Sequence, residues 1–314
     1  MKPLPSAWIT PDWPAPPGVR AVCTTRACPP GAAASAPPWR GFNLGAHVGD
    51  APAAVAAHRA ALGQALGVRP VFLEQVHGVQ VQVLRSGVPD GRVADAACCA
   101  ERGLACTVMV ADCLPVLLAR ADGRAVAAAH AGWRGLAAGV LEAAAQALRD
   151  VDQEPPEPAL KSAQKISKPP KTPVNTAIAA MENVANRGFE TGEKGCVQAP
   201  AAPAAPALLA WLGPCIGPAA FEVGAPVRAA FMDAAGRGDA AAQARVAACF
   251  APAAGGKYWA DLPALARLRL AALGVPAWGN DGSAAWCTVS QPQRFYSYRA
   301  QGVTGRMAAC IWLE

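Results

Sequence analysis

Two histidines and one cysteine carry the clearest chemical signal in this chain. His77 precedes a glycine, Cys113 stands between Asp112 and Leu-Pro, and His130 opens the run His-Ala-Gly-Trp-Arg-Gly. The whole chain of 314 residues has only four histidines, so their grouping with a cysteine among glycines and apolar runs is unusual. Two imidazoles and a thiolate supply three zinc ligands and leave one position open, as in catalytic zinc sites.

The same residues also fit other chemistry. Cys113 could act as a nucleophile that His77 or His130 activates and Asp112 orients. Asp112 could instead hydrogen-bond a histidine ligand, serve as a base, or be an ordinary turn residue. The chain has no Cys-x-x-Cys pair, which favours an open site over a structural four-ligand zinc. The residues alone leave both a zinc site and a Cys–His hydrolase open.

The elements that position these residues can be predicted from apolar periodicity. His77 falls in a turn between two strands, Cys113 at the start of an apolar strand, and His130 at the end of a strand. Strands and helices mix without a regular alternation, which predicts an α+β fold rather than a doubly wound sheet. Strands are expected over 19–25, 70–74, 79–84, 105–110, 114–119, 124–129 and near the C-terminal end, and helices over 52–67, 136–149, 226–236 and 261–274.

Residues 151–206 differ from the rest of the chain in composition. They hold five of the seven lysines and several proline clusters, whereas the rest of the chain prefers arginine and alanine. This composition is typical of an inserted, disordered linker, with an interaction arm as the alternative and one helical candidate over 174–186. We therefore expect residues 1–150 and 207–314 to form one catalytic domain together.

Composition also excludes several classes of protein. The net charge of +6 is mild and the arginines are scattered, so we expect no nucleic-acid partner. No run of eighteen apolar residues exists, so we expect no membrane partner. The start has no signal-peptide apolar region, and the odd number of cysteines, eleven, favours free thiols and a cytoplasmic protein. Nucleotide-binding glycine motifs are absent, which gives no support to a kinase or a nicotinamide dehydrogenase.

Three arginines are candidates for binding phosphate: Arg26, which follows two threonines, and Arg134 and Arg306, which each stand beside a glycine. Arg26, Arg134 and Arg306 each could hold a phosphate through two parallel hydrogen bonds, and a plain surface arginine is the alternative for each. Gly132 lies in a glycine-rich turn from a strand to a helix, where backbone N–H groups can face an anion.

Eight short segments follow one another along the chain: 24–26, 43–50, 73–78, 111–115, 129–135, 212–218, 221–224 and 304–308. In this order they resemble the multicopper polyphenol oxidase (laccase-domain) family, whose members are regarded as purine nucleoside phosphorylases with adenosine deaminase activity. The sequence departs from the family pattern in the long insertion and at His58-Arg59, where the family suggests Asn-Arg.

The resemblance implies a single α+β domain with layered mixed β-sheets and flanking helices, and Zn²⁺ held by His77, Cys113 and His130. It implies cleavage of purine nucleosides by phosphate to the base and ribose 1-phosphate, with adenosine deamination and methylthioadenosine phosphorolysis as further activities. The residues expected to act are Cys113, Asp112 and Arg134 in catalysis, and Arg26, Asn43, Gln75, Gly132 and Arg306 in substrate or phosphate binding.

Two other functions remain as alternatives. One is a laccase-like copper oxidase of polyphenols, which four histidines are too few to support with a multicopper cluster. The other is a Cys–His hydrolase acting on an amide or a cell-wall precursor. The oligomeric state is not predicted.

Overall fold

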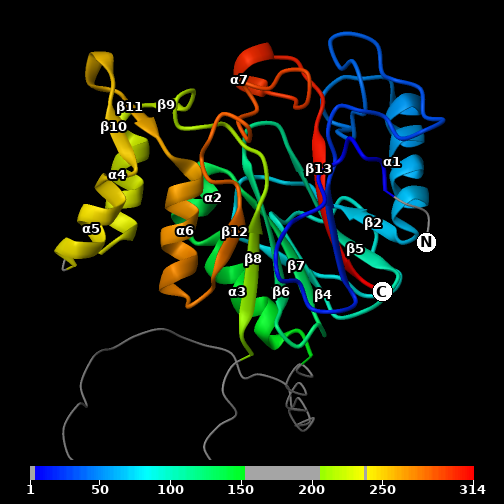
Figure 1. Ribbon diagram of the computed structural model, residues 1–314, viewed down its shortest axis with the longest axis horizontal. Coiled ribbons are helices and arrows are strands. Elements are labelled where there is room, and N and C mark those ends of the chain that lie inside the picture. Colours follow the sequence, from blue (N-terminus) through cyan, green and yellow to red (C-terminus); the bar gives the residue numbers. More distant parts are fainter. Residues whose placement is uncertain (1–3, 153–205, 237–238) are drawn as a thin grey trace, which may run out of the picture. The chain divides into compact units, whose positions relative to one another are not determined.

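The computed structural model describes residues 4–152, 206–236 and 239–314, and two stacked mixed sheets form their centre (Figure 1). The four-stranded sheet has the order β1 (Val19–Cys23), β13 (Met307–Leu313), β5 (Leu104–Val110) and β2 (Arg69–Phe72). The six-stranded sheet has the order β12 (Ala277–Gly279), β8 (Leu208–Leu212), β6 (Leu114–Arg120), β7 (Val126–Ala131), β4 (Ala96–Cys99) and β3 (Val81–Val83).

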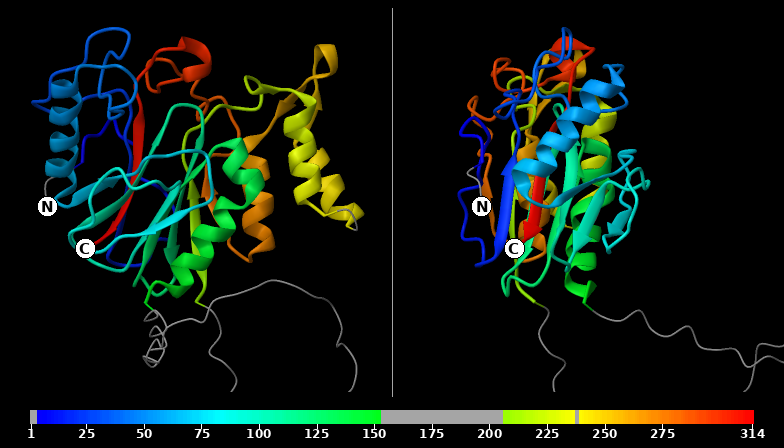
Figure 2. Two further views of the ribbon diagram at one scale, coloured as in Figure 1. Left: turned by 180° about the vertical axis from the view of Figure 1, so that it is seen from behind. Right: turned by 90° about the vertical axis from the view of Figure 1, so that its right-hand side faces the viewer.

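Helices cover the outer faces of both sheets (Figures 1 and 2). Helix α1 (Pro52–Leu66) packs on the four-stranded sheet, and α3 (Val140–Asp150) and α6 (Leu262–Ala272) pack on the six-stranded sheet. The remaining elements are α2 (Trp133–Ala138), α4 (Ala225–Ala234), α5 (Ala240–Ala247), α7 (Tyr298–Gln301), the 3₁₀ turn Ala254–Gly256, and a small sheet of β10 (Phe250–Pro252), β11 (Tyr258–Ala260) and β9 (Glu222–Val223). The expected α+β fold with layered mixed sheets is confirmed.

Strand β6 shows why the central strands are apolar without interruption. Leu114, Val116 and Leu118 pack in the core under the helices, whereas Leu117 and Ala119 pack in the core between the two sheets. Successive side chains point to opposite faces of a strand, so a strand buried on both faces needs apolar residues at every position. The same alternation places Cys98 and its neighbour Cys99 in different cores.

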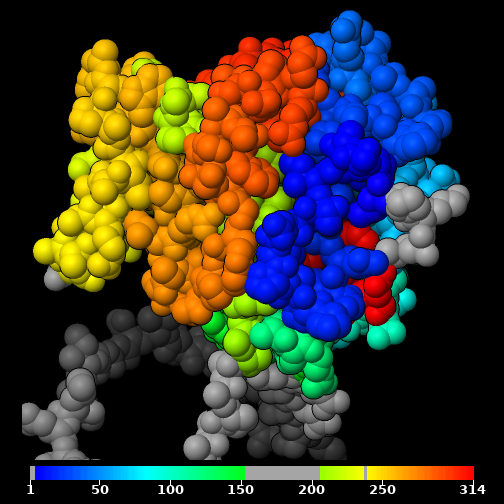
Figure 3. Space-filling model, in the orientation of Figure 1, coloured from blue at the N-terminus to red at the C-terminus, as the bar shows by residue number. Residues whose placement is uncertain are grey.

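The open end of the core between the sheets is closed by two irregular segments. Ile9 and Trp13 precede β1, Trp278 lies in β12 and Trp286 follows it; all four pack against the buried core between the sheets. In the space-filling view the N-terminal segment and the segment that precedes α7 lie side by side on this face (Figure 3). Large apolar side chains from these segments therefore keep water out of the layer between the sheets.

Helix ends agree with the sequence in two places and differ in one. Helix α1 ends at Gly67 as expected, with φ 72° in the left-handed region that glycine favours, and the Asp261 side chain accepts a hydrogen bond from Ala264 at the start of α6. The single helix expected over 136–149 is wrong, because Gly139 adopts φ 104° and separates α2 from α3.

The described residues on either side of the expected insertion lie at the end of β6 that is remote from Cys113. Leu208, the first residue of β8, pairs with Arg120 at the end of β6, and Arg120 also forms an ion pair with Asp152. Strand β6 runs seven residues from Leu114 to Arg120, a length of roughly 20 Å at the usual rise per residue. Residues 153–205, with the helical candidate, lie outside the described residues, so the proposed division into domains stays a prediction.

One structural observation concerns helices that could span a membrane. Within the described ranges, none of the helices combines the length and the apolar character that a bilayer crossing requires.

The first testable prediction concerns the core between the sheets. Leu117 has no exposed surface there, and Leu117→Ala removes its buried methyl groups and leaves a cavity. We expect the free energy of unfolding in urea to fall by about 2–5 kcal/mol. Val303→Ala, at a side chain that is 52% exposed, is the control and should change it little. An equal loss in both variants would contradict this packing.

Candidate metal centre

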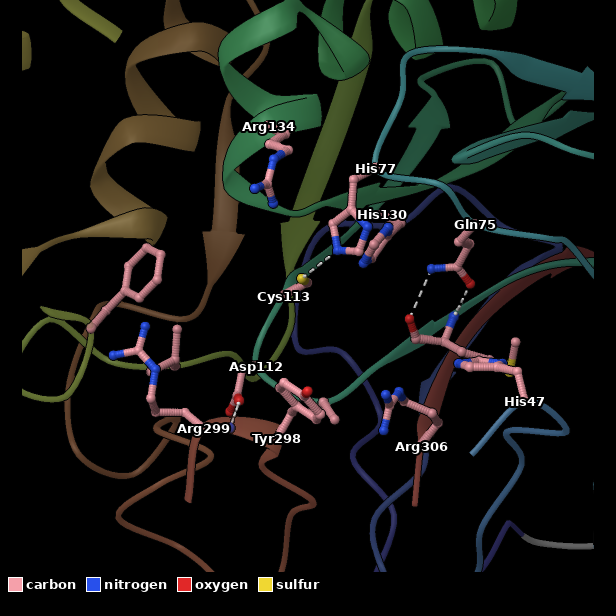
Figure 4. A pocket seen from close by; sticks show the side chains of 14 residues that line it. His47, Gln75, His77, Asp112, Cys113, His130, Arg134, Tyr298, Arg299 and Arg306 are labelled. Atoms are coloured by element: carbon pink, nitrogen blue, oxygen red, sulfur yellow. Dashed lines mark hydrogen bonds between the residues drawn. The ribbon is translucent and has the colours of Figure 1, made fainter. Parts of the chain in front are cut away.

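His77, Cys113 and His130 come together at one point, as Figure 4 shows. Their donor atoms all lie within 4.8 Å of one another, and Cys113 Sγ is 3.6 Å from His77 Nε2. Zinc bonded tetrahedrally to sulfur and nitrogen separates these two atoms by about 3.6 Å. No second metal-ligating group of this kind exists in the part of the chain that the structure describes. The donor set and its spacing therefore fit one metal ion.

The register of two strands explains why Cys113 meets His130. Pro115 of β6 pairs with His130 of β7 in the antiparallel ladder, and Cys113 lies just before β6. His77 arrives on a different segment, the crossing from β2 in the four-stranded sheet to β3 in the six-stranded sheet. Cys113 also lies in a crossing between the sheets, from β5 to β6. The site thus forms where the chain passes from one sheet to the other.

Gly132 lets the three ligands approach one another. A Cβ atom at this position would lie 2.7 Å from His77 Cδ2 and 3.0 Å from Cys113 Sγ, which is closer than carbon atoms tolerate. Gly135 does the same for the loop that carries His77, because a Cβ there would lie 2.8 Å from the carbonyl oxygen of Gly78. The glycines of the His-Ala-Gly-Trp-Arg-Gly run therefore make room for the ligands. The expected contact of the Gly132 N–H with an anion stays a prediction.

Asp95, which the sequence analysis missed, is the carboxylate that contacts a histidine ligand. It has no exposed surface, and its Oδ1 lies 2.8 Å from Nδ1 of His130. The expectation that Asp112 makes such a bond is wrong. Asp112 Oδ1 accepts a hydrogen bond from Thr288 (2.6 Å) and Oδ2 accepts one from the backbone N–H of Arg299 (2.7 Å). The sequence did hold a signal for Asp95, because this acidic residue directly precedes the apolar run 96–99. A carboxylate that is buried beside such a run needs hydrogen-bonding partners.

The electrostatics of the site favour the thiolate. Burial alone would raise the pKa of Cys113, but the neighbouring His130 and His77 outweigh it and lower that pKa to about 6. Burial would lower the pKa of His130, but Cys113 and Asp95 raise it to about 9. Burial opposes ionisation of Asp95 as well, yet its hydrogen bonds from His130 and the backbone leave its pKa below the usual value. The sulfur is therefore held in the form that binds metals and attacks electrophiles.

Two residues of the site have backbone conformations that are rare outside glycine. His77 has φ 61° and Asp112 has φ 92°, and they are the only non-glycine residues with positive φ over the ranges that the structure describes. Such conformations persist only where surrounding contacts hold them, and they gather at functional sites. One of these two residues is a candidate metal ligand and the other directly precedes Cys113. Their position supports a functional role for the candidate metal centre.

The metal centre opens into a pocket of about 510 Å³ (Figure 4). Four expected site residues besides the ligands line it, and several unexpected residues join them. The expected ones are Gln75, Asp112, Arg134 and Arg306, and the unexpected ones are His47, Met109, Ala111, Ile216, Phe221, Tyr298 and Arg299. His47, Tyr298 and Arg299 lie far from the ligands in sequence, and only the tertiary fold brings them to the pocket.

Two expected phosphate ligands do not line this pocket. The Arg26 guanidinium bonds the carbonyl oxygens of Arg40 and Pro292 and lies beside a separate surface hollow. Asn43 has no exposed surface, and its amide bonds Gly45, Asp50 and the backbone N–H of Arg306. Both side chains hold loops in place outside this pocket, and their expected phosphate contacts stay predictions.

Gln75 reaches the pocket but uses both ends of its amide on the backbone of Met109. Its Nε2 donates to the Met109 carbonyl oxygen (2.9 Å), and its Oε1 accepts from the Met109 N–H (2.8 Å). This pair of bonds ties the crossing that carries His77 to the end of β5. Gln75 thus supports the wall of the pocket.

The charged side chains that face the pocket are mainly cations. Arg134 lies over the Trp133 ring, and Arg299 lies over the Phe221 ring. Burial lowers the pKa of His47, and the positive charges of Arg306 and Arg59 lower it further, so His47 is neutral at neutral pH. Asp112 is the one carboxylate that lines this pocket, and both of its oxygens have partners. The pocket is therefore suited to an anion.

The fold and the site define the class: an α+β protein of stacked mixed sheets with a His–Cys–His group that could hold a metal ion beside a cationic pocket. The sequence matches a family model described as multi-copper polyphenol oxidoreductase laccase over residues 20–161 and 193–314. The chain belongs to this family, and the resemblance found in the sequence is confirmed.

Relatives of known name are similar over nearly their full length. A purine nucleoside phosphorylase of Pseudomonas aeruginosa is 41% identical over 98% of this chain and 99% of the relative. The purine nucleoside phosphorylase YfiH of Escherichia coli is 40% identical over the same shares. The crystal structure of protein NMB0706 of Neisseria meningitidis superposes with a TM-score of 0.71, at 36% identity, over 98% of this chain and 100% of that chain.

The second testable prediction concerns Gly132, where there is no space for a side chain. Gly132→Ala places a methyl group against His77 and Cys113, so we expect the variant to fold but to bind much less metal. Elemental analysis after reconstitution with zinc and dialysis measures the loss. Gly63→Ala in α1 is the control, because its added methyl group would meet only ordinary contacts, 3.4 Å from Pro70 Cδ and 3.7 Å from the Val68 carbonyl oxygen. Full zinc content in the Gly132 variant would contradict the proposed ligand set.

Proposed function

We propose that the protein is a zinc-dependent purine nucleoside phosphorylase. The observation that carries the proposal is the His77–Cys113–His130 group, which leaves one coordination position open towards a pocket lined by three arginines. Relatives that are about 40% identical over their full length bear the name of this activity. We further propose that adenosine deamination and methylthioadenosine phosphorolysis occur at the same site.

Zinc is the metal that the donor set supports best. Two imidazoles and one thiolate form a mixed nitrogen and sulfur set, which tetrahedral zinc accepts. Zinc held there would act as a Lewis acid towards an oxygen of the substrate, phosphate or water in the open position.

Copper oxidase chemistry finds less support, although the family description mentions copper. A multicopper cluster needs many imidazoles, and this chain has four. One of them, His58, is buried, and its two ring nitrogens lie 2.8 and 2.7 Å from the carbonyl oxygens of Asn43 and Ala33. His77 and His130 share a single group with Cys113, which leaves only His47. We therefore do not favour a copper oxidase.

Phosphorolysis exchanges one bond at the ribose for another. An oxygen of inorganic phosphate bonds to C1′, the bond from C1′ to the purine nitrogen breaks, and the base leaves with that electron pair and takes up a proton. The transition state resembles an oxocarbenium ion, so a phosphate dianion held beside C1′ stabilises it. The enzyme must therefore hold phosphate and nucleoside together.

Arg306 is the side chain we assign to phosphate. Its Nη1 donates to the carbonyl oxygens of Thr304 and Gly305, which fixes the guanidinium and leaves Nε and Nη2 for a ligand. Neutral His47 lies beside it and can donate a further hydrogen bond. Arg134, whose guanidinium lies over the Trp133 ring, faces the same pocket from α2. Arginine forms paired hydrogen bonds with phosphate oxygens.

Aromatic side chains on the other wall are suited to a purine ring. Tyr298 is 60% exposed and lines the pocket, as does Phe221. Asp112 holds Arg299, the next residue of α7, through its backbone N–H, and so keeps Tyr298 at the rim. Asp112 thus serves the pocket by positioning α7, and we assign no proton transfer to it.

We also propose the cytoplasm as the compartment. All ten cysteines of the described residues are free, and eight of them are buried. Free thiols in this number are typical of proteins from reducing compartments.

The activity itself is the third testable prediction. Zinc-loaded protein incubated with inosine or adenosine should release the base and ribose 1-phosphate only when phosphate is present, and a chelator should abolish this until zinc is restored. Chromatography of base and sugar phosphate measures both products. Absence of ribose 1-phosphate at every zinc loading would exclude the proposal. Metal-free activity that disappears in Cys113→Ser would favour the Cys–His hydrolase instead.

The fourth prediction concerns Arg306. Arg306→Gln removes the charge that faces phosphate, and we expect the KM for phosphate to rise by about 10- to 100-fold, as for a lost charged hydrogen bond. The KM for the nucleoside should change much less. Arg20→Gln, which breaks only a surface ion pair with Glu314, is the matched control. An unchanged KM for phosphate in the Arg306 variant would move the phosphate site elsewhere.

A further inference from the structure

Asp95 joins the two histidines of the metal centre. Its carboxylate accepts hydrogen bonds from the backbone N–H groups of Val76 (3.1 Å), His77 (2.9 Å) and Gly78 (2.6 Å), and it bonds Nδ1 of His130 (2.8 Å). The residue has no exposed surface. We infer that Asp95 is a positioning residue that sets both imidazoles for metal binding, an inference that rests on the proposed metal site.

The first effect of Asp95 is on the backbone of His77. Three successive N–H groups converge on one carboxylate, which curls residues 76–78 around it. His77 lies in the middle of this curl with φ 61°, a conformation that residues with a Cβ rarely adopt unless other contacts hold them. The four-residue span from Gln75 to Gly78 is thus fixed at both ends, because the Gln75 side chain bonds Met109. The imidazole of His77 is delivered to Cys113 by this fixed backbone.

The second effect is on the ring of His130. A carboxylate beside Nδ1 favours the tautomer that carries its proton there, so Nε2 is the nitrogen that can give a lone pair to a metal. The backbone N–H of His130 also donates to the carbonyl oxygen of Asp95 at 2.7 Å, which places the two residues side by side. Asp95 therefore orients the ring and selects Nε2 as its ligand atom. Partners of this kind raise the basicity of a histidine ligand and tighten metal binding.

The third effect is on charge. A divalent metal with two neutral imidazoles and one thiolate carries a net charge of +1. Asp95 supplies the one negative charge that balances it, and it lies where water does not reach. Unbalanced charge is costly in a buried site. Removal of this single charge should therefore weaken metal binding even when the shape of the side chain is kept.

Asp50 offers a matched comparison. It is also a buried carboxylate (8% exposed), and it accepts hydrogen bonds from Ser35, Asn43 and the backbone N–H of Ala51. It makes no contact with His77, Cys113 or His130. A change from aspartate to asparagine at this position costs the protein a buried carboxylate without touching the metal ligands.

The fifth prediction compares Asp95→Asn with Asp50→Asn. Zinc affinity is measured at fixed pH by competition with a chromophoric chelator. We expect Asp95→Asn to bind zinc about 10- to 100-fold more weakly than the unaltered protein, the range found for lost partners of metal ligands, and Asp50→Asn to bind it as tightly. Urea unfolding of the zinc-free variants separates loss of affinity from loss of fold.

The outcomes are distinct. Zinc binding by Asp95→Asn as tight as that of the unaltered protein would overturn the inference, while the metal site would stand. Failure of the unaltered protein to bind zinc would overturn the metal site itself, and the inference with it.

A second measurement needs no variant. Nitrogen-15 NMR of the zinc-loaded protein should show the His130 ring protonated at Nδ1 and bonded to zinc through Nε2. The opposite arrangement would overturn the role of Asp95, even if Asp95→Asn failed to fold.

Discussion

The antiparallel pairing of β6 with β7 in one register is the interaction on which the site depends. It places Pro115 opposite His130, and therefore brings Cys113 to the same end of the sheet. A shift by one residue would turn every side chain of β6 to the other face, because the period of a strand is two. Leu117 would then leave the core between the sheets for the core under the helices. The apolar packing on both faces of β6 thus fixes the geometry of the metal centre.

Two segments cross between the sheets, from β2 to β3 and from β5 to β6, and each contains one residue with a strained backbone conformation. His77 and Asp112 hold positive φ angles, which cost about 1–3 kcal/mol each. Carboxylates stabilise both crossings in complementary ways. Asp95 accepts three backbone N–H groups of the first crossing, while the Asp112 side chain anchors Thr288 and α7 to the second. The metal centre and the wall of the pocket are therefore linked through hydrogen bonds to two buried or half-buried carboxylates.

The sequence was informative where the signal was local and uninformative where it depended on tertiary contacts. Rare residue types at strand ends pointed to His77, Cys113 and His130, and apolar periodicity predicted the helix over 52–67 that forms α1. Asp95 was missed because its partners lie in a separate crossing and in another strand. The sequence did not show that the Arg26 guanidinium bonds the carbonyl oxygens of Arg40 and Pro292, because these partners come from distant parts of the chain. The break between α2 and α3 was missed because glycine within an alanine-rich helix leaves its φ angle open.

The central claim is that two imidazoles and one thiolate hold a single zinc ion and leave one position open. X-ray absorption spectroscopy at the zinc edge, on protein loaded with one equivalent, tests it most directly. The account predicts one sulfur at about 2.3 Å, two imidazole nitrogens at about 2.0–2.1 Å and one further light atom. A zinc shell without sulfur, or one with several sulfurs, would contradict it.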